Sequence, residues 1–213
     1  MLNPVQLTRP AILTAAIAIL DEYGLADTTM RRIAKQLGVA PGALYWHFPN
    51  KQALLAGIAD ELLRPLLTHA DEPADSQPQT SWDQGLHMAA TSLHDCMLSV
   101  TDGADVIATA LANPQLRQRV LAACAAPLAQ HPTINVDDPL ALEAAATIVD
   151  YVVGATIGEQ SRLRLAQFAT TTTPKDNKPN TPNTPTSDPA PTTPTMRVSD
   201  GVSIIIDGIT TRL

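Results

Sequence analysis

The side chains best suited to binding chemistry lie within residues 28–51. Arg31 and Lys51 are positively charged, so each can neutralise a phosphate. Tyr45 and His47 carry hydrogen-bond donors that can bind phosphate oxygens. Ala43 can contact a thymine methyl group, and an arginine can also reach a guanine edge. A surface with both kinds of group can bind the backbone of duplex DNA and read its bases. The candidate DNA contacts are Thr29, Arg31, Pro41, Gly42, Ala43, Tyr45, His47 and Lys51.

Two short helices joined by a tight turn are expected to position these side chains. The spacing of Ile33 and Leu37 predicts a helix over 29–37 with one buried face. Gly38 can adopt positive φ and end that helix. Pro41 suits the first turn of the next helix, because its missing N–H has no helical partner there. This arrangement places the second helix in the DNA major groove.

The string LGVAPGALYWHFPNKQALL resembles the DNA-binding segment of the tetracycline repressor (TetR-type) family. The resemblance implies an all-helical homodimer with an N-terminal helix-turn-helix and a C-terminal domain that binds a small molecule. Ala40 departs from the pattern, because many relatives carry Ser or Thr there. The missing oxygen costs about 1 kcal/mol of helix capping, and Pro41 partly offsets the loss.

Composition points to the same fold class. The chain has 213 residues, of which 45% are hydrophobic and only 3% aromatic. The core must therefore be built from Ala, Leu, Ile and Val, and Ala and Leu favour helix. We expect an all-α protein with a three-helix helix-turn-helix domain over 1–50 and a helical ligand-binding and dimerisation domain over 51–213.

The charge is unevenly distributed. The net charge of −7 argues against a protein that coats nucleic acid. Residues 1–51 hold five Lys/Arg and three Asp/Glu, giving +2, whereas 52–213 hold nine and eighteen, giving −9. This asymmetry fits a localised DNA-binding surface on an acidic body.

Cysteine usage and apolar segments indicate the compartment. Cys96 and Cys124 lie in apolar helical patterns, so buried free thiols are favoured over a disulfide. We find no N-terminal signal pattern and no apolar span of about 18 residues. The expectation is a cytoplasmic protein without membrane contact.

Periodicity and helix-breaking residues divide the rest of the chain. The first expected helix covers 8–23 and is ended by Gly24. The next covers 50–63, with Asn50 as a candidate N-cap and a kink or end at Pro65. The others cover 82–100, 104–112, 114–130, 140–158 or beyond, and 198–213. Residues 71–80 are expected to form a loop. Residues 170–195 contain ten Thr and seven Pro, so we expect a disordered or polyproline-like segment. The resemblance implies that helix 140–158 and the closing helix form a four-helix bundle in a homodimer, which would read palindromic DNA.

The same resemblance bears on the ligand. The metal-binding His of tetracycline repressors falls on Ile107 here, and their metal-linked acid falls on or near Gly158, beside Glu159. Ile cannot ligate a metal, so we expect no metal site and no cofactor. His87, His94 and Asp95 are expected at the surface rather than as ligands. We predict instead an apolar pocket lined by Leu67, Leu86, Ala89, Leu93, Ile107 and Ala110, with ordinary core packing as the alternative.

The leading hypothesis is a transcriptional repressor released from a palindromic operator by a small, largely apolar effector. One alternative is a dimeric small-molecule-binding module that does not bind specific DNA. Another is a sensor of tetracycline-like drugs with an altered metal site. An enzyme is not expected, because the chain has no nucleophile elbow, P-loop or Gly-rich dinucleotide loop.

Overall fold

The computed structural model describes residues 7–71, 80–131, 139–171 and 197–211. Throughout these ranges the chain is helical and forms no strand, which confirms the all-α prediction. The helices are α1 (Arg9–Asp27), α2 (Met30–Leu37), α3 (Pro41–Tyr45), α4 (Lys51–Leu62), α5 (Arg64–Asp71), α6 (Trp82–Leu98), α7 (Gly103–Ala110), α8 (Pro114–Ala125), the 3₁₀ turn η2 (Ala126–Gln130), α9 (Pro139–Thr171) and α10 (Val198–Thr210).

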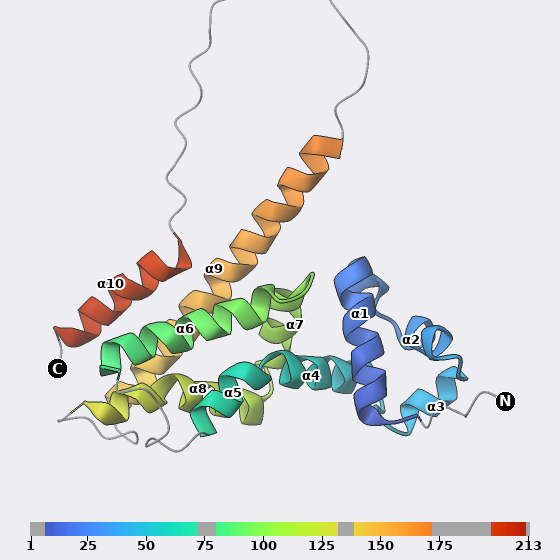
Figure 1. Cartoon of the computed structure of the whole chain (residues 1–213), viewed down its shortest axis with the longest axis horizontal. Helices are drawn as coiled ribbons and strands as arrows, with labels where there is room; N and C mark the ends of the chain where they lie inside the picture. Colours follow the sequence, from blue (N-terminus) through green and yellow to red (C-terminus); the bar gives the residue numbers. More distant parts are fainter. Residues whose placement is uncertain (1–6, 72–79, 132–138, 172–196, 212–213) are drawn as a thin grey trace, which may run out of the picture.

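The first three helices form one end of the molecule, and α4 leads from them into the body (Figure 1). Local signals set their limits. The Thr8 hydroxyl accepts a hydrogen bond from Ala11 N at 3.3 Å, and the Asn50 side chain accepts one from Ala53 N at 2.8 Å. Gly24 interrupts α1 with φ of 78°, a conformation that favours glycine. The predicted break at Gly24 and the predicted cap at Asn50 are confirmed.

The body is built around α6 and α9, which pack against each other and against α10 (Figure 1). The helix α8 covers α9 from another side, and α7 contacts both α4 and α9. Their apolar faces share one core with the N-terminal helices. Its largest fully buried side chains are Phe48, Ile12, Ile19, Leu20, Ile33, Leu44, Leu54, Ile58, Leu63, Leu86, Leu93 and Met97.

The boundaries of α4 and α9 differ from expectation. The helix predicted over 50–63 ends at Leu62, and α5 starts again at Arg64, so Pro65 lies in the first turn of a new helix. The helix predicted from 140 runs from Pro139 to Thr171 and includes the continuation that the pattern allowed. Most of the expected loop at 71–80 and most of the Thr/Pro segment at 170–195 lie outside the described residues.

The long α9 corrects the expectation of no apolar span. The segment Pro139–Ala166 is long and apolar enough to cross a membrane by length and composition alone. Of its apolar 18-residue stretch, 39% is buried inside the protein. A core helix of a soluble protein meets the same criterion. Since α9 contacts α6, α7, α8 and α10, its apolar residues have partners within the protein.

Both cysteines are free and buried, which confirms the prediction of buried thiols. Burial raises the pKa of Cys124 to about 12 and also raises the pKa of Cys96. Because the thiolate is the reactive form, both side chains act as small apolar groups at neutral pH.

Gly57 and Gly42 offer a matched test of packing near the N-terminal helices. A Cβ atom at Gly57 would lie 2.9 Å from Cε1 of the buried Phe48 ring and 3.1 Å from Cδ2 of Leu13, whereas nothing lies within 4 Å at Gly42. Both alanine variants gain helix propensity, but only Gly57→Ala overpacks the core. We expect Gly57→Ala to be less stable than Gly42→Ala by about 1–3 kcal/mol, measured by urea unfolding. Equal stability of the two variants would contradict this packing.

Candidate nucleic-acid interface and ligand pocket

The turn between α2 and α3 is built as the sequence predicts. The Thr29 hydroxyl caps α2 by accepting a hydrogen bond from Arg32 N at 3.2 Å. Gly38 ends α2 in the left-handed conformation with φ of 68°, and Val39 N donates to Ala34 O at 3.0 Å. Pro41 begins α3, and Ala40 makes no side-chain cap, so the expected capping defect is present.

One face of α3 is anchored and the other is open. Leu44 and Phe48 are fully buried and hold the helix against the core. Pro41, Gly42 and Tyr45 are exposed, and Ala43 is half-buried. The residues predicted to read DNA from α3 are therefore presented to solvent.

Three other predicted contacts have structural partners as well. The oxygen of Thr29 serves as the α2 cap. Lys51 Nζ donates to Leu25 O at 3.3 Å, close to the end of α1. His47 is half-buried, and its carbonyl oxygen accepts a hydrogen bond from Arg9 Nη1 at 2.9 Å. Each of these residues thus helps to hold the turn.

The neighbouring arginines of α2 have different roles. Arg32 pairs with Asp27 at 2.7 Å and lies over the Tyr23 ring at 3.6 Å, so it ties α2 to α1. Arg31 is exposed and has no hydrogen bond or ion pair with any residue that the structure describes. The guanidinium of Arg31 is therefore free to bind a ligand such as a phosphate.

Trp46 was missed by the sequence analysis. Trp46 follows α3 directly and is 91% exposed. Such high exposure is unusual for a tryptophan side chain. Its place between two proposed contacts, Tyr45 and His47, was the signal available in the sequence. Tyr45, the residue before it, is 50% exposed, so two consecutive aromatic side chains face solvent at the end of α3.

The six predicted ligand contacts are distributed differently from the prediction. Leu86, Leu93 and Ile107 are fully or almost fully buried. Leu67 and Ala110 are also buried, and Ala89 packs against the core while partly exposed. Large aliphatic side chains fill the space between their helices, so these residues form core in the chain described here. Leu67 borders a cavity between α1, α4, α5 and α8.

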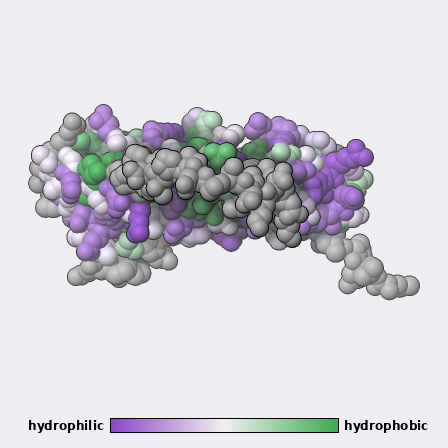
Figure 2. Space-filling model, turned by 90° about the horizontal axis from the view of Figure 1, so that it is seen from above, coloured by the Kyte–Doolittle hydropathy of each residue, from purple (hydrophilic) through white to green (hydrophobic). Residues whose placement is uncertain are grey.

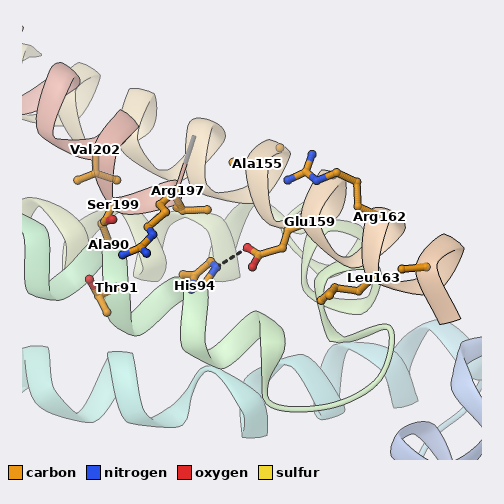
Figure 3. Close-up of a pocket in the computed structure, with 14 residues that line it drawn as sticks. Ala90, Thr91, His94, Ala155, Glu159, Arg162, Leu163, Arg197, Ser199 and Val202 are labelled. Atoms are coloured by element: carbon orange, nitrogen blue, oxygen red, sulfur yellow. Dashed lines mark hydrogen bonds and ion pairs between the residues drawn. The ribbon is translucent and has the colours of Figure 1, made fainter. Parts of the chain in front are cut away.

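An open pocket lies at the other face of α6. It has a volume of about 1070 Å³ and lies between α6, α9 and α10 (Figure 3). Small residues create the space, because Gly154, Ala155 and Gly158 of α9 face Ala90 of α6 across it. Leu163 and Val202 add apolar surface. A volume of this size suits a small organic ligand.

A polar contact crosses this pocket. His94 Nε2 lies 2.9 Å from Glu159 Oε2 (Figure 3). On the other side of the ring, His94 Nδ1 lies 3.5 Å from Asp95 Oδ1. The half-buried position of His94 differs from the surface placement expected for it. Within the described part of the chain, no group of three or more His, Cys, Asp and Glu residues could hold a metal ion.

A second polar cluster connects the body to α1. Asp102 has φ of 57°, and its Oδ2 accepts a hydrogen bond from Leu25 N at 2.8 Å. Thr101 N donates to Asp21 Oδ1 at 3.1 Å. Gly24 is required here, because a Cβ atom at that position would lie 2.8 Å from Asp102 Oδ2.

Two residues of α9 hold this cluster from the other side. Arg164 pairs with Asp102 at 2.9 Å and with Asp105 at 2.8 Å, and these carboxylates, Asp105 first, raise the pKa of Arg164. Gln160 is buried, donates to Met97 O and Val100 O, and accepts from Ala104 N. The turn between α6 and α7 is thus fixed to α9 and to α1 at once.

The fold and the exposed second helix define a helix-turn-helix protein with a helical body. Residues 12–58 match the family described as "Bacterial regulatory proteins, tetR family", and residues 73–213 match "Tetracyclin repressor-like, C-terminal domain". The chain therefore belongs to the TetR family, and the resemblance seen in the sequence is confirmed.

Individual relatives agree with this assignment. The chain is 37% identical over 114 residues to the class C tetracycline repressor of Escherichia coli, covering 53% of this chain and 50% of the relative. The alignment thus spans about half the length of that curated relative. Mycobacterium smegmatis BioQ is similar in structure, with a TM-score of 0.69 and 31% identity over 97% of this chain and 100% of the other. A structure of BioQ with its natural double-stranded DNA operator gives a TM-score of 0.67 and 32% identity over 96% and 98% of the two chains.

Asp102 and Asp105 allow the contact to α1 to be tested. Asp102→Gly keeps a residue that tolerates positive φ but removes the acceptor of Leu25 N–H. We expect the Leu25 amide to exchange with solvent about tenfold faster, because a charge-assisted hydrogen bond is lost. Asp105→Ala is the control, since Asp105 pairs with Arg164 but not with α1. Equal exchange rates in the two variants, measured by hydrogen exchange with NMR, would show that Asp102 does not hold α1.

Proposed function

We propose that this protein is a ligand-responsive DNA-binding transcriptional regulator, and most simply a repressor of a palindromic operator. The observation that carries the proposal is the exposure of Tyr45 at the end of α3 and of Trp46 directly after it, together with the exposed Arg31 of α2. Membership of the TetR family and the operator complex of BioQ support it. The family consists of transcriptional regulators, which supports a non-catalytic role in the cytoplasm.

The proposal includes a homodimer formed through α9 and α10. Leu165 is 69% exposed and Ile204 is 63% exposed, and both are large apolar side chains on these helices. Seen from above, apolar surface gathers over the middle of the molecule and the side of α10, while the end with α1 to α3 is mostly hydrophilic (Figure 2). A second copy would cover such apolar surface, and two recognition helices would then read a palindrome.

The domain division and the site residues belong to the same proposal. We propose residues 1–50 as the DNA-binding domain and 51–213 as the ligand-binding and dimerisation domain. The proposed DNA contacts are Thr29, Arg31, Pro41, Gly42, Ala43, Tyr45, His47 and Lys51, to which the structure leads us to add Trp46. For the effector, we propose the open pocket between α6, α9 and α10 in place of the six core residues.

An effector can act only if it prefers one conformation of the dimer. The N-terminal helices are connected to the body through α4, which packs on α7, and through the hydrogen bond from Leu25 N to Asp102. A ligand between α6 and α9 would change the position of α7 or of Arg164, and both connections would transmit the change. The distance between the two recognition helices would then no longer fit the operator.

A second candidate is a dimeric ligand-binding module without specific DNA binding, favoured by the missing side-chain cap at Ala40. A sensor of metal-bound tetracycline is less well supported, because Ile107 occupies the position of the metal-binding His and is fully buried.

Tyr45→Ala and Trp46→Ala separate these candidates. If α3 binds DNA, we expect each variant to bind a palindromic duplex from the region upstream of its own gene about tenfold or more weakly. The measurement is fluorescence anisotropy at fixed salt, with circular dichroism to show an unchanged helix content. Met88→Ala is the control, because Met88 is a similarly exposed apolar side chain far from α3 in the chain. Unchanged DNA affinity in both aromatic variants would favour the module without DNA binding.

Replacement of Arg31 adds an electrostatic test. If its guanidinium contacts a phosphate, Arg31→Gln should weaken binding to all duplexes alike and reduce the slope of log affinity against log salt by about 1 per lost contact. A slope equal to that of the unaltered protein would exclude a phosphate contact at this residue.

A further inference from the structure

The pocket between α6, α9 and α10 carries an unbalanced positive charge. Four of its lining residues are ionisable: His94, Glu159, Arg162 and Arg197. The Glu159 carboxylate is held by His94 at 2.9 Å. Among the described residues, neither arginine makes an ion pair or a side-chain hydrogen bond with its guanidinium group. Two free cations thus face one pocket of a chain whose net charge is −7.

The two guanidinium groups approach the pocket from different helices. Arg197 immediately precedes α10, and in Figure 3 its side chain extends toward Thr91 and His94 of α6. Arg162 lies on α9 and folds back over Gly158, where its Nη1 would be 3.4 Å from an added Cβ atom. The absence of a side chain at Gly158 therefore gives the Arg162 guanidinium space to pack there.

The rest of the lining is mostly apolar and small. Leu163, Val198 and Val202 offer apolar surface, and Gly154, Ala155 and Ala90 leave depth. A ligand that matches both parts has an apolar body and an anionic end. Glu159 would repel a second negative charge, so a single carboxylate fits better than a phosphate or a dicarboxylate.

We propose that this pocket binds an amphipathic monocarboxylate, whose carboxylate pairs with Arg197 and is attracted by the charge of Arg162, and whose hydrocarbon part lies on Leu163, Val198 and Val202. Guanidinium groups bind carboxylates through paired hydrogen bonds, which gives direction as well as attraction. The proposal deepens the proposed function by naming the chemical class of the effector, and its regulatory consequence rests on that function. The binding itself does not depend on DNA.

Three probes with the same chain length test the charge selection. We would titrate the full chain with dodecanoate, dodecanol and dodecylammonium below their aggregation limits, using isothermal titration calorimetry near neutral pH. Dodecanoate is expected to bind at least about tenfold more tightly than the other two. Absence of dodecanoate binding, or equal affinity for the alcohol or the amine, would overturn the proposal.

Arginine variants locate the site. Arg162→Gln and Arg197→Gln are each expected to weaken dodecanoate binding several-fold, and the double variant at least about tenfold. Arg64→Gln is the control, because Arg64 is an exposed arginine outside the pocket that pairs with Glu61, one turn away at the end of α4. All variants are first compared by thermal unfolding, since neither pocket arginine has an ion-pair partner to lose within the part of the chain that the structure describes. Full affinity in the double variant would place the ligand elsewhere and overturn the proposal.

DNA binding is measured on the same samples so that the two proposals can fail separately. If the protein binds dodecanoate but no DNA, the proposal of a regulator fails and the proposal of a carboxylate pocket stands. If the protein binds DNA, if no probe changes that binding and if dodecanoate gives no heat of binding, the regulator proposal stands and the pocket proposal fails. Release of the duplex by dodecanoate, lost in the double arginine variant, would support both.

Discussion

The contact between α1 and the turn before α7 is the constraint on which the arrangement of the molecule depends. Two residues with positive φ, Gly24 and Asp102, meet there, and a side chain at Gly24 would collide with the Asp102 carboxylate. The same carboxylate accepts the Leu25 N–H and pairs with Arg164. The interaction is local in space but joins residues 77 and 62 positions apart in the chain. It therefore determines how the N-terminal helices sit on the body, beyond what α4 alone provides.

The parts of the fold that sequence reasoning predicted are those set by neighbouring residues. Gly38 ends α2, Asn50 caps α4 and Gly24 breaks α1 because each acts on backbone groups within a few positions. The apolar spacing of α2 and α3 likewise needs only one turn of helix to be recognised. These local rules were sufficient for the helix-turn-helix and for the all-α class.

The location of the ligand pocket depends on contacts distant in the sequence, which local patterns do not predict. The pattern of Leu86, Leu93 and Ile107 shows that these residues face inward, but it does not show whether other side chains fill the space between them. The structure fills it. The open volume arises instead where Gly154 and Gly158 of α9 meet Ala90 of α6, and no periodicity in the sequence marks that meeting. Trp46 was missed because the spacing of the buried residues Leu44 and Phe48 does not by itself assign a face to the residue between them, which the structure shows to be exposed.

The position of the pocket along α9 explains how a ligand there can reach the DNA-binding end. Glu159 faces the pocket, Gln160 fixes the turn between α6 and α7, and Arg164 holds Asp102. Helical rise places Glu159 and Arg164 only about 8 Å apart along the axis. A ligand carboxylate in the pocket would repel the Glu159 carboxylate and compete with it for the contact to His94. Any rotation of α9 that relieves this competition moves Gln160 and Arg164 together, because both lie on the same rigid helix. The ligand pocket and the contact to α1 are thus two ends of one short segment, which is the condition for binding at one to be felt at the other.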